Sequence, residues 1–130
     1  MDREIRLYFS QIIVRSRCDA PFFHNDWAKV NNDAFTFLTP ITGDPPTFGL
    51  LYQNGRGKVS EYRNKAGEGI LFGDFFTHST TPGVRDHAEA VLCFEFGTDR
   101  MEHWDKVFAA IKGQARTIRM PNGQFIRNEF

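Results

Sequence analysis

The chain has 130 residues, of which 41% are hydrophobic and 25% are charged, and this fits one globular domain over 1–130 because a domain usually takes about 100 to 200 residues. Sixteen basic and sixteen acidic residues cancel, which leaves no positive field for non-specific binding to nucleic acid or an anionic membrane. Two cysteines are too few for a disulfide framework, and no apolar run reaches the roughly 20 residues of a membrane span. We therefore expect a cytoplasmic protein with no nucleic-acid or membrane partner.

Short apolar stretches separated by turn residues occupy the chain up to position 98, a rhythm typical of an all-β sandwich or barrel. The expected strands, in chain order, are 5–14, 21–26, 34–41, 47–53, 58–63, 69–72, 75–80 and 88–96. Fourteen phenylalanines suggest a thick aromatic core between two facing sheets. Eight strands in this rhythm predict a jelly roll.

The apolar period changes to that of a helix after position 98. One helical face over 99–112 carries Met101, Trp104, Val107, Phe108 and Ile111. We expect this helix to pack outside the sandwich. The tail contains Pro-Asn-Gly at 121–123, which predicts a terminal hairpin.

Side chains alternate between the two faces of a strand, so one inward residue fixes the orientation of its neighbours. Four large apolar side chains are expected inside the sandwich: Leu71, Leu92, Phe94 and Phe96. The same alternation turns Ala88 and Ala90 inward and Glu89 outward.

The most informative motif is His24-Asn25-Asp26, because residues i and i+2 of a strand point to the same face. One imidazole and one carboxylate then project side by side, and His78, near the end of the strand series, is the natural third ligand. Two His and one carboxylate on one side of a cation leave other positions open, as in non-haem Fe(II) oxygenases. A His-x-Asp triplet can also serve ordinary hydrogen bonding, so the triplet alone is compatible with a metal site and with a structural role. Its place near the start of the strand series, with His78 near the end, favours the metal site.

The order of these motifs, with a G-x-G-type strand before the distal His and an apolar strand after it, resembles the Fe(II)/2-oxoglutarate-dependent dioxygenases over 21–97. The phytanoyl-CoA hydroxylase-like branch is the most similar. The resemblance implies a double-stranded β-helix with a cupin-type core, and Fe(II) held by His24, Asp26 and His78. It further implies 2-oxoglutarate as co-substrate and hydroxylation of a C–H bond in a small-molecule substrate.

The chain departs from this family at the cation that binds the far carboxylate of 2-oxoglutarate. The family places an Arg or Lys about ten residues after the distal His, where this sequence reads Asp-His-Ala-Glu-Ala. Arg85 is the nearest substitute, since a guanidinium can hold a carboxylate with two hydrogen bonds. A solvated turn residue is the other reading of Arg85. Arg56, Lys58 and Arg63 on the middle strands are weaker alternatives.

Two functions follow from these observations. The first is a small Fe(II)- and 2-oxoglutarate-dependent oxygenase that hydroxylates an unidentified small molecule, with no catalytic residue assigned beyond the metal ligands. The second is a non-catalytic, cupin-like jelly-roll binding module, with or without a divalent metal. It stays open because the family generally carries helices and a lid outside the barrel, and this chain has little beyond it. A homodimer is compatible with either function.

Overall fold

The computed structural model describes residues 4–42 and 48–129, and strands dominate its regular structure. A four-stranded sheet has the order β1-β7-β2-β5. Its strands are β1 (Ile5–Cys18), β2 (Ala34–Pro40), β5 (Ile70–Phe72) and β7 (Gly83–Thr98). A three-stranded sheet has the order β4-β3-β6, with β3 (Gly49–Gln53), β4 (Val59–Arg63) and β6 (His78–Thr80). Every pairing is antiparallel, and the all-β prediction is confirmed.

The longest strands, β1 and β7, pair from Ile5 opposite Thr98 to Cys18 opposite Gly83. Both exceed their predicted lengths, because two irregularities in β1 let the pairing continue while the sheet twists. The expected strand at 21–26 is mostly irregular and keeps one bridge to β6. The strand expected over 75–80 begins only at His78, after Phe75 with its positive φ of 61°. Position 47, the first residue of another expected strand, lies outside the described residues.

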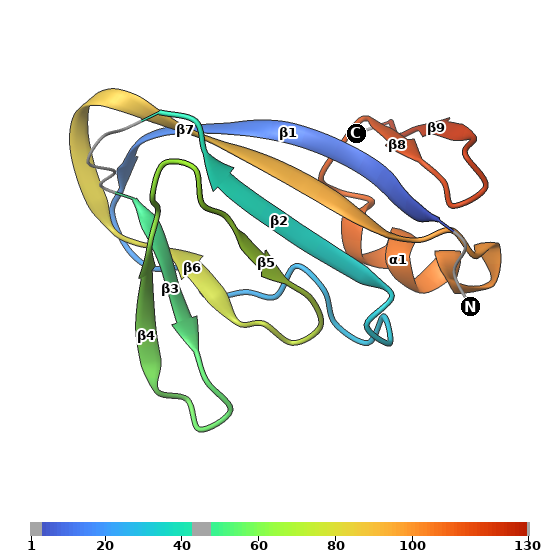
Figure 1. Cartoon of the computed structure of the whole chain (residues 1–130), viewed down its shortest axis with the longest axis horizontal. Helices are drawn as coiled ribbons and strands as arrows, with labels where there is room; N and C mark the ends of the chain where they lie inside the picture. Colours follow the sequence, from blue (N-terminus) through green and yellow to red (C-terminus); the bar gives the residue numbers. More distant parts are fainter. Residues whose placement is uncertain (1–3, 43–47, 130) are drawn as a thin grey trace.

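The predicted helix over 99–112 divides into a 3-10 turn, η1 (Met101–His103), and α1 (Trp104–Ile111). The terminal hairpin forms from β8 (Thr117–Arg119) and β9 (Phe125–Arg127). Figure 1 shows α1, β8 and β9 gathered at one end of the long strands and β3 and β4 towards the other. Among the described residues, no helix has the length and apolar character to cross a membrane.

The main buried cluster packs α1 against the end of the four-stranded sheet where β1 and β2 begin. Its members are Tyr8, Phe9, Trp27, Val30, Ala34, Trp104, Val107, Ile111 and Ile118. The apolar stripe of α1 therefore closes one end of the molecule, and the space between the sheets beyond it holds the polar residues of the site described below.

The four-stranded sheet faces the opposite way from the prediction. Leu71 is 57% exposed, and it pairs with Phe37, which in turn pairs with Phe94. On β7, Cys93 and Glu95, which alternate with Leu92, Phe94 and Phe96, are buried instead. Leu71, Leu92, Phe94 and Phe96, predicted inside, thus lie on the face turned away from the three-stranded sheet.

The same inversion corrects the orientation of the residues at 88–90. Glu89 is buried, at 4% exposed, whereas Ala88 is exposed. The prediction assumed that the most apolar face of a strand faces the interior, but here the inner face carries the polar side chains of a cavity. We call the reversed surface the outer face, and it comprises Ile5, Leu7, Ile12, Val14, Phe35, Phe37, Leu71, Leu92, Phe94 and Phe96.

Candidate metal centre

The backbones of His24 and His78 meet as an isolated antiparallel pair. Each N–H donates to the carbonyl of the other residue, and both N···O distances are 2.9 Å. Residues opposed in this way present their side chains on the same face, and the ring centroids lie 4.5 Å apart. One bridge therefore brings together two histidines that are far apart in the sequence.

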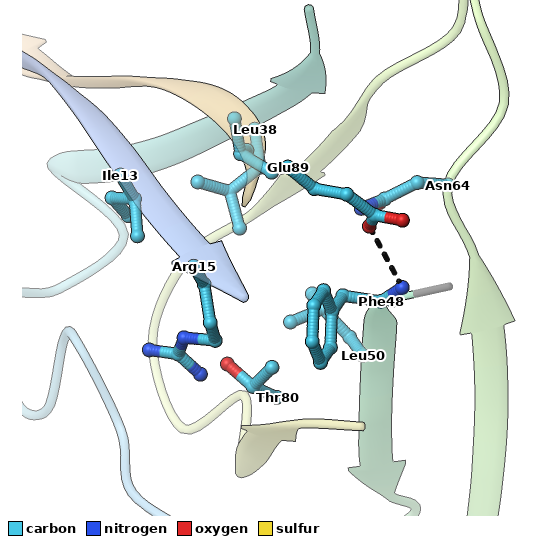
Figure 2. A pocket seen from close by; sticks show the side chains of 10 residues that line it. Ile13, Arg15, Leu38, Phe48, Leu50, Asn64, Thr80 and Glu89 are labelled. Atoms are coloured by element: carbon cyan, nitrogen blue, oxygen red, sulfur yellow. Dashed lines mark hydrogen bonds between the residues drawn. The ribbon is translucent and has the colours of Figure 1, made fainter. Parts of the chain in front are cut away.

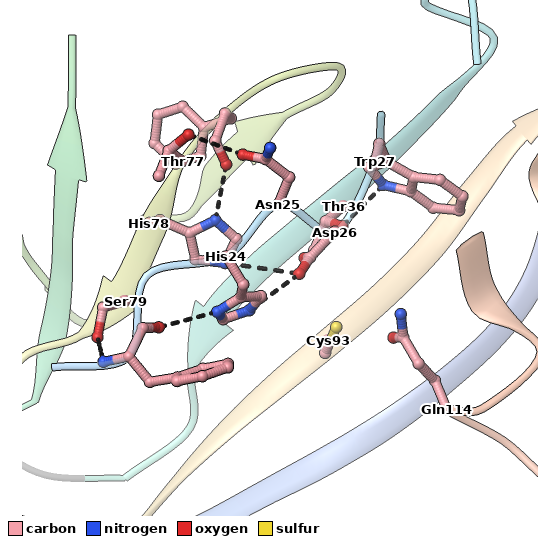
Figure 3. A network of polar contacts seen from close by, with 12 residues as sticks. His24, Asn25, Asp26, Trp27, Thr36, Thr77, His78, Ser79, Cys93 and Gln114 are labelled. Atoms are coloured by element: carbon pink, nitrogen blue, oxygen red, sulfur yellow. Dashed lines mark hydrogen bonds and ion pairs between the residues drawn. The ribbon is translucent and has the colours of Figure 1, made fainter. Parts of the chain in front are cut away.

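Asp26 completes the group because it follows His24 by two residues. Its Oδ1 lies 3.3 Å from Nε2 of His24 and 3.6 Å from Nε2 of His78, and one ligand atom from each residue lies within 4.8 Å of the other two (Figure 3). The side chains of His24, Asp26 and His78 are 43%, 14% and 5% exposed. The structure thus brings the three predicted ligands together, and the group is open to solvent on the His24 side.

Backbone carbonyls fix the orientation of both imidazoles. Nδ1 of His24 lies 3.0 Å from the carbonyl oxygen of Phe22, and Nδ1 of His78 lies 3.0 Å from that of Phe76. A carbonyl only accepts, so each Nδ1 carries the proton and each neutral ring keeps its lone pair on Nε2. Both lone pairs then face the carboxylate of Asp26. With both rings neutral, the two Nε2 atoms and Oδ1 of Asp26 are three converging acceptors, an arrangement that a cation would stabilise.

The charge state of His78 agrees with this arrangement. Burial lowers the pKa of His78, while its hydrogen bond to Phe76 and the charge of Asp26 act in the opposite direction. The net lowering favours the neutral ring at physiological pH, and the neutral imidazole is the form that binds metals.

Two side-chain contacts fasten the segment around His24 to β6. The hydroxyl of Thr77 donates to Oδ1 of Asn25 at 2.8 Å, and the N–H of Phe22 donates to Oγ of Ser79 at 2.7 Å. These two bonds stand where a regular strand would make further backbone hydrogen bonds to the segment around His78. They hold His24, Asn25 and Asp26 in place although this segment is not a regular strand.

A buried polar network contacts Oδ2 of Asp26, the carboxylate oxygen that does not face the histidines. Oγ1 of Thr36 lies 3.0 Å from Oδ2 of Asp26 and 2.8 Å from Oε2 of Glu95, and it accepts from Nε1 of Trp27 at 2.9 Å. Burial, followed by the charge of Asp26, raises the pKa of Glu95 to about 8. The thiol of Cys93 donates to Oε1 of Glu95 at 3.4 Å, and burial raises the pKa of Cys93 strongly.

The triad lines a cavity of about 300 Å³ that also contains Arg15. Arg15 borders a second, smaller cavity of about 60 Å³ next to it, and Figure 2 shows its guanidinium beside Thr80. Within 4–42 and 48–129, the structure gives Arg15 no carboxylate partner. A half-buried cation therefore lines the same cavity as the triad, and no ion pair joins it to a carboxylate of the described residues.

The predicted cofactor-binding residue, Arg85, has a different environment. It lies within β7 rather than in a turn, so the reading as a solvated turn residue is wrong. Its Nε donates to Oε1 of buried Glu89 at 2.8 Å, and it does not line the cavity of the triad. Its role in binding 2-oxoglutarate stays a prediction.

Comparisons with known proteins give a fold likeness. No protein-family model matches the chain, and no curated protein matches its sequence. A solved structure described as "Non-heme monooxygenase, ThoJ-Ni complex" is similar with a TM-score of 0.58 and 12% identity, over 74% of this chain and 45% of that one. The chain thus spans less than half the length of that monooxygenase, and at this identity the likeness concerns the fold.

Sequence reasoning missed Arg15, Thr36 and Glu95. Arg15 shares the inward face of β1 with Gln11 and Ile13, which line the same cavity. That alternation is a usable signal once the orientation of the sheet is known. The reversed orientation of β7 hid Glu95, since an acidic residue between two phenylalanines reads as the solvated side of a strand.

Proposed function

We propose that the chain is a jelly-roll domain of a mononuclear non-haem Fe(II) oxygenase that uses 2-oxoglutarate as co-substrate. The observation that carries this proposal is the convergence of three acceptors, Nε2 of His24, Oδ1 of Asp26 and Nε2 of His78, with both Nδ1 atoms occupied by carbonyls. Two imidazoles and one carboxylate are the donor set of non-haem Fe(II) oxygenases. The likeness to a non-haem monooxygenase fold supports the same class.

The strand order supports a jelly roll of the double-stranded β-helix type. From β2 onwards the chain passes back and forth between the sheets: β2 lies in the four-stranded sheet, the hairpin β3–β4 in the other, β5 in the first, β6 in the second, and β7 in the first again. The bridge at His24 extends the smaller sheet beyond β6. Both sheets then contribute to the walls of the cavity that contains the triad, as expected for ligand sites in such barrels.

His24, Asp26 and His78 would hold the metal, and Fe(II) with 2-oxoglutarate would supply the activation of O2 needed to hydroxylate a C–H bond. The protein positions the ligands and controls their proton content. The carbonyls of Phe22 and Phe76 keep the protons of the two imidazoles on Nδ1. The hydroxyl of Thr36 restrains the second oxygen of the carboxylate.

Arg15 is the cation that we assign to the far carboxylate of 2-oxoglutarate. It lines the cavity of the triad and has no carboxylate partner among the described residues, whereas Arg85 is paired with Glu89. A guanidinium recognises a carboxylate with two charged hydrogen bonds. An anchor on β1 would take the place of the family's usual cation on the last core strand.

The experiment measures 2-oxoglutarate binding to the Fe(II)-loaded protein without oxygen, and succinate formation after oxygen is admitted. A charged hydrogen bond contributes roughly 1.5 to 3 kcal/mol, so Arg15→Ala should weaken 2-oxoglutarate about 10- to 150-fold and leave metal affinity nearly unchanged. Arg17→Ala is the matched control, because Arg17 is exposed on the same strand and pairs with Asp19. Arg85→Ala tests the residue that the sequence favoured.

Three results are informative. Loss of affinity in Arg15→Ala alone supports the assignment, and loss in Arg85→Ala alone transfers the role to Arg85. If the iron-loaded protein neither binds 2-oxoglutarate nor forms succinate, dependence on 2-oxoglutarate is wrong. A metal-binding module of the same fold then describes the chain better.

A further inference from the structure

The outer face of the four-stranded sheet is apolar across its width. The large side chains that define it come from all four strands, and its polar positions, Ser10 and Thr39, are uncharged. A sheet face that meets water normally alternates to charged and polar residues. This surface therefore has the composition of a buried face.

The aromatic rings of the outer face pack against one another within the sheet, and no other element of the described chain covers them. Ring centroids of Phe35 and Phe96 lie 6.1 Å apart, and those of Phe37 and Phe94 lie 6.4 Å apart. The ring of Phe37 lies over Gly69, where an added Cβ would come within 2.3 Å of its Cζ. The flanking aliphatic residues remain accessible: Ile5 is 75% exposed and Ile12 is 60% exposed. The face is thus internally packed, while its aliphatic margin lies open to solvent.

The area is sufficient for a specific interface. With strands about 4.8 Å apart and a rise of about 3.4 Å per residue, the region from Ile5 to Val14 across the sheet covers roughly 500 Å². Monomeric proteins rarely expose continuous apolar patches of more than a few hundred Å². Two such faces in contact would bury about 1,000 Å², which is the lower bound for a stable interface.

We infer that the outer face is a self-association surface on which a second copy of this chain packs, sheet against sheet, around a two-fold axis. The residues that define this face carry no charge, and Asp33 at its margin is already paired with Arg100 and His103. An uncharged apolar sheet is complementary to its own copy and offers nothing to a charged partner. Packing of two sheets face to face, about 10 Å apart, is the ordinary way to cover such surfaces. A two-fold axis lets one patch serve both subunits and closes the assembly at two.

The test is the association state of the whole chain by sedimentation velocity over a wide range of concentrations. Ile12→Glu and Leu71→Lys each place a charge on the outer face at a position exposed in the single chain, so a free chain tolerates them. In the dimer the charge is buried without a partner, which should raise the dissociation constant at least about 100-fold. Phe125→Glu is the control, since Phe125 is 69% exposed on β9, which belongs to the separate two-stranded sheet β8-β9.

The expected pattern is a dimer for the parent and for Phe125→Glu, and monomers with unchanged circular dichroism for the other two variants. A parent that stays monomeric at high concentration overturns the inference. A dimer that survives both Ile12→Glu and Leu71→Lys also overturns it, because the contact then lies elsewhere. Binding of the monomeric parent to neutral lipid vesicles would assign the face to a membrane surface instead.

Discussion

The hydroxyl of Thr36 has one proton and three polar neighbours. Nε1 of Trp27 donates to it, and Oδ2 of Asp26 and Oε2 of Glu95 both lie within 3.0 Å of it. If the proton goes to Asp26, Glu95 must be protonated and donate its own proton to Thr36. The raised pKa of Glu95, about 8, agrees with this direction. A neutral Glu95 thus orients the hydroxyl that holds the carboxylate of Asp26.

Replacement of this hydroxyl tests its positioning role. Thr36→Val keeps the shape of the side chain but removes its bond to Asp26, and loss of a hydrogen bond behind a metal ligand typically lowers affinity about 10- to 100-fold. Calorimetric titration with Fe(II) without oxygen gives the affinity. Thr39→Val, at a partly exposed position on the same strand whose hydroxyl donates to the carbonyl of Glu68 and not to Asp26, should leave it unchanged. Equal affinities in all three proteins would mean that Thr36 serves packing alone.

Glu95 predicts how stability changes with pH in the metal-free protein. Its pKa rises from 4.5 to about 8 on folding, so between these values the folded protein holds a proton that the unfolded chain releases. The contribution of Glu95 to the free energy of unfolding is therefore complete below about pH 4.5 and is lost as the pH rises towards 8. The loss amounts to a few kcal/mol, because each pKa unit corresponds to about 1.4 kcal/mol. Urea unfolding of Glu95→Gln should lack this decrease. Parallel pH profiles for the parent and the variant would contradict it.

The convergence of His24, Asp26 and His78 was expected from the sequence. The i, i+2 spacing predicted His24 and Asp26 side by side, and His78 was expected from its place near the end of the strand series. The structure brings the three together although 21–26 is not a regular strand. The cation was not predictable in the same way. Arg85 was favoured because it follows His78 closely in the sequence, whereas Arg15 lies just beyond the predicted strand 5–14 and lines the cavity because β1 continues to Cys18.

The helix α1 contributes to stability through its buried stripe. Val107 and Ile111 are fully buried against the start of the four-stranded sheet. Ile111→Ala should lower the free energy of unfolding by about 2 to 5 kcal/mol, because it removes apolar contacts and leaves a cavity. Lys106→Ala, at an exposed helix position, should change it by less than about 0.5 kcal/mol. Urea denaturation measures both, and similar values for the two variants would show that the helix packs loosely.

Elements with a clear period were predicted better than elements without one. The helical stripe and the Pro-Asn-Gly turn gave α1 and the hairpin β8–β9 within a few residues. The segment around His24 was expected to be a regular strand but is tied to β6 by one backbone bridge and the side chains of Asn25 and Ser79. Such side-chain bonds replace a ladder without leaving a periodic signal in the sequence.

At the scale of the whole molecule, the polarity of the two sheet faces is reversed. The inner face carries Arg15, Thr36 and Glu95 around the cavity, and the outer face carries the phenylalanines. Alternation fixes the two sets of residues, but which set faces inward depends on what covers each face. A cavity lined by polar side chains inside and an apolar face outside explain why hydrophobicity alone assigned them wrongly.

Stoichiometric Fe(II) binding is the most direct test of the metal centre. Anaerobic calorimetric titration should give one Fe(II) per parent chain, and His78→Ala should lose it because the two remaining donors cannot complete the site. His103→Ala, at a histidine paired with Asp33 away from the triad, should bind as the parent does. At 100 times its dissociation constant the metal should add about 2.7 kcal/mol to stability. A parent chain that binds no Fe(II), or a His78→Ala variant that binds it equally well, would contradict the metal centre.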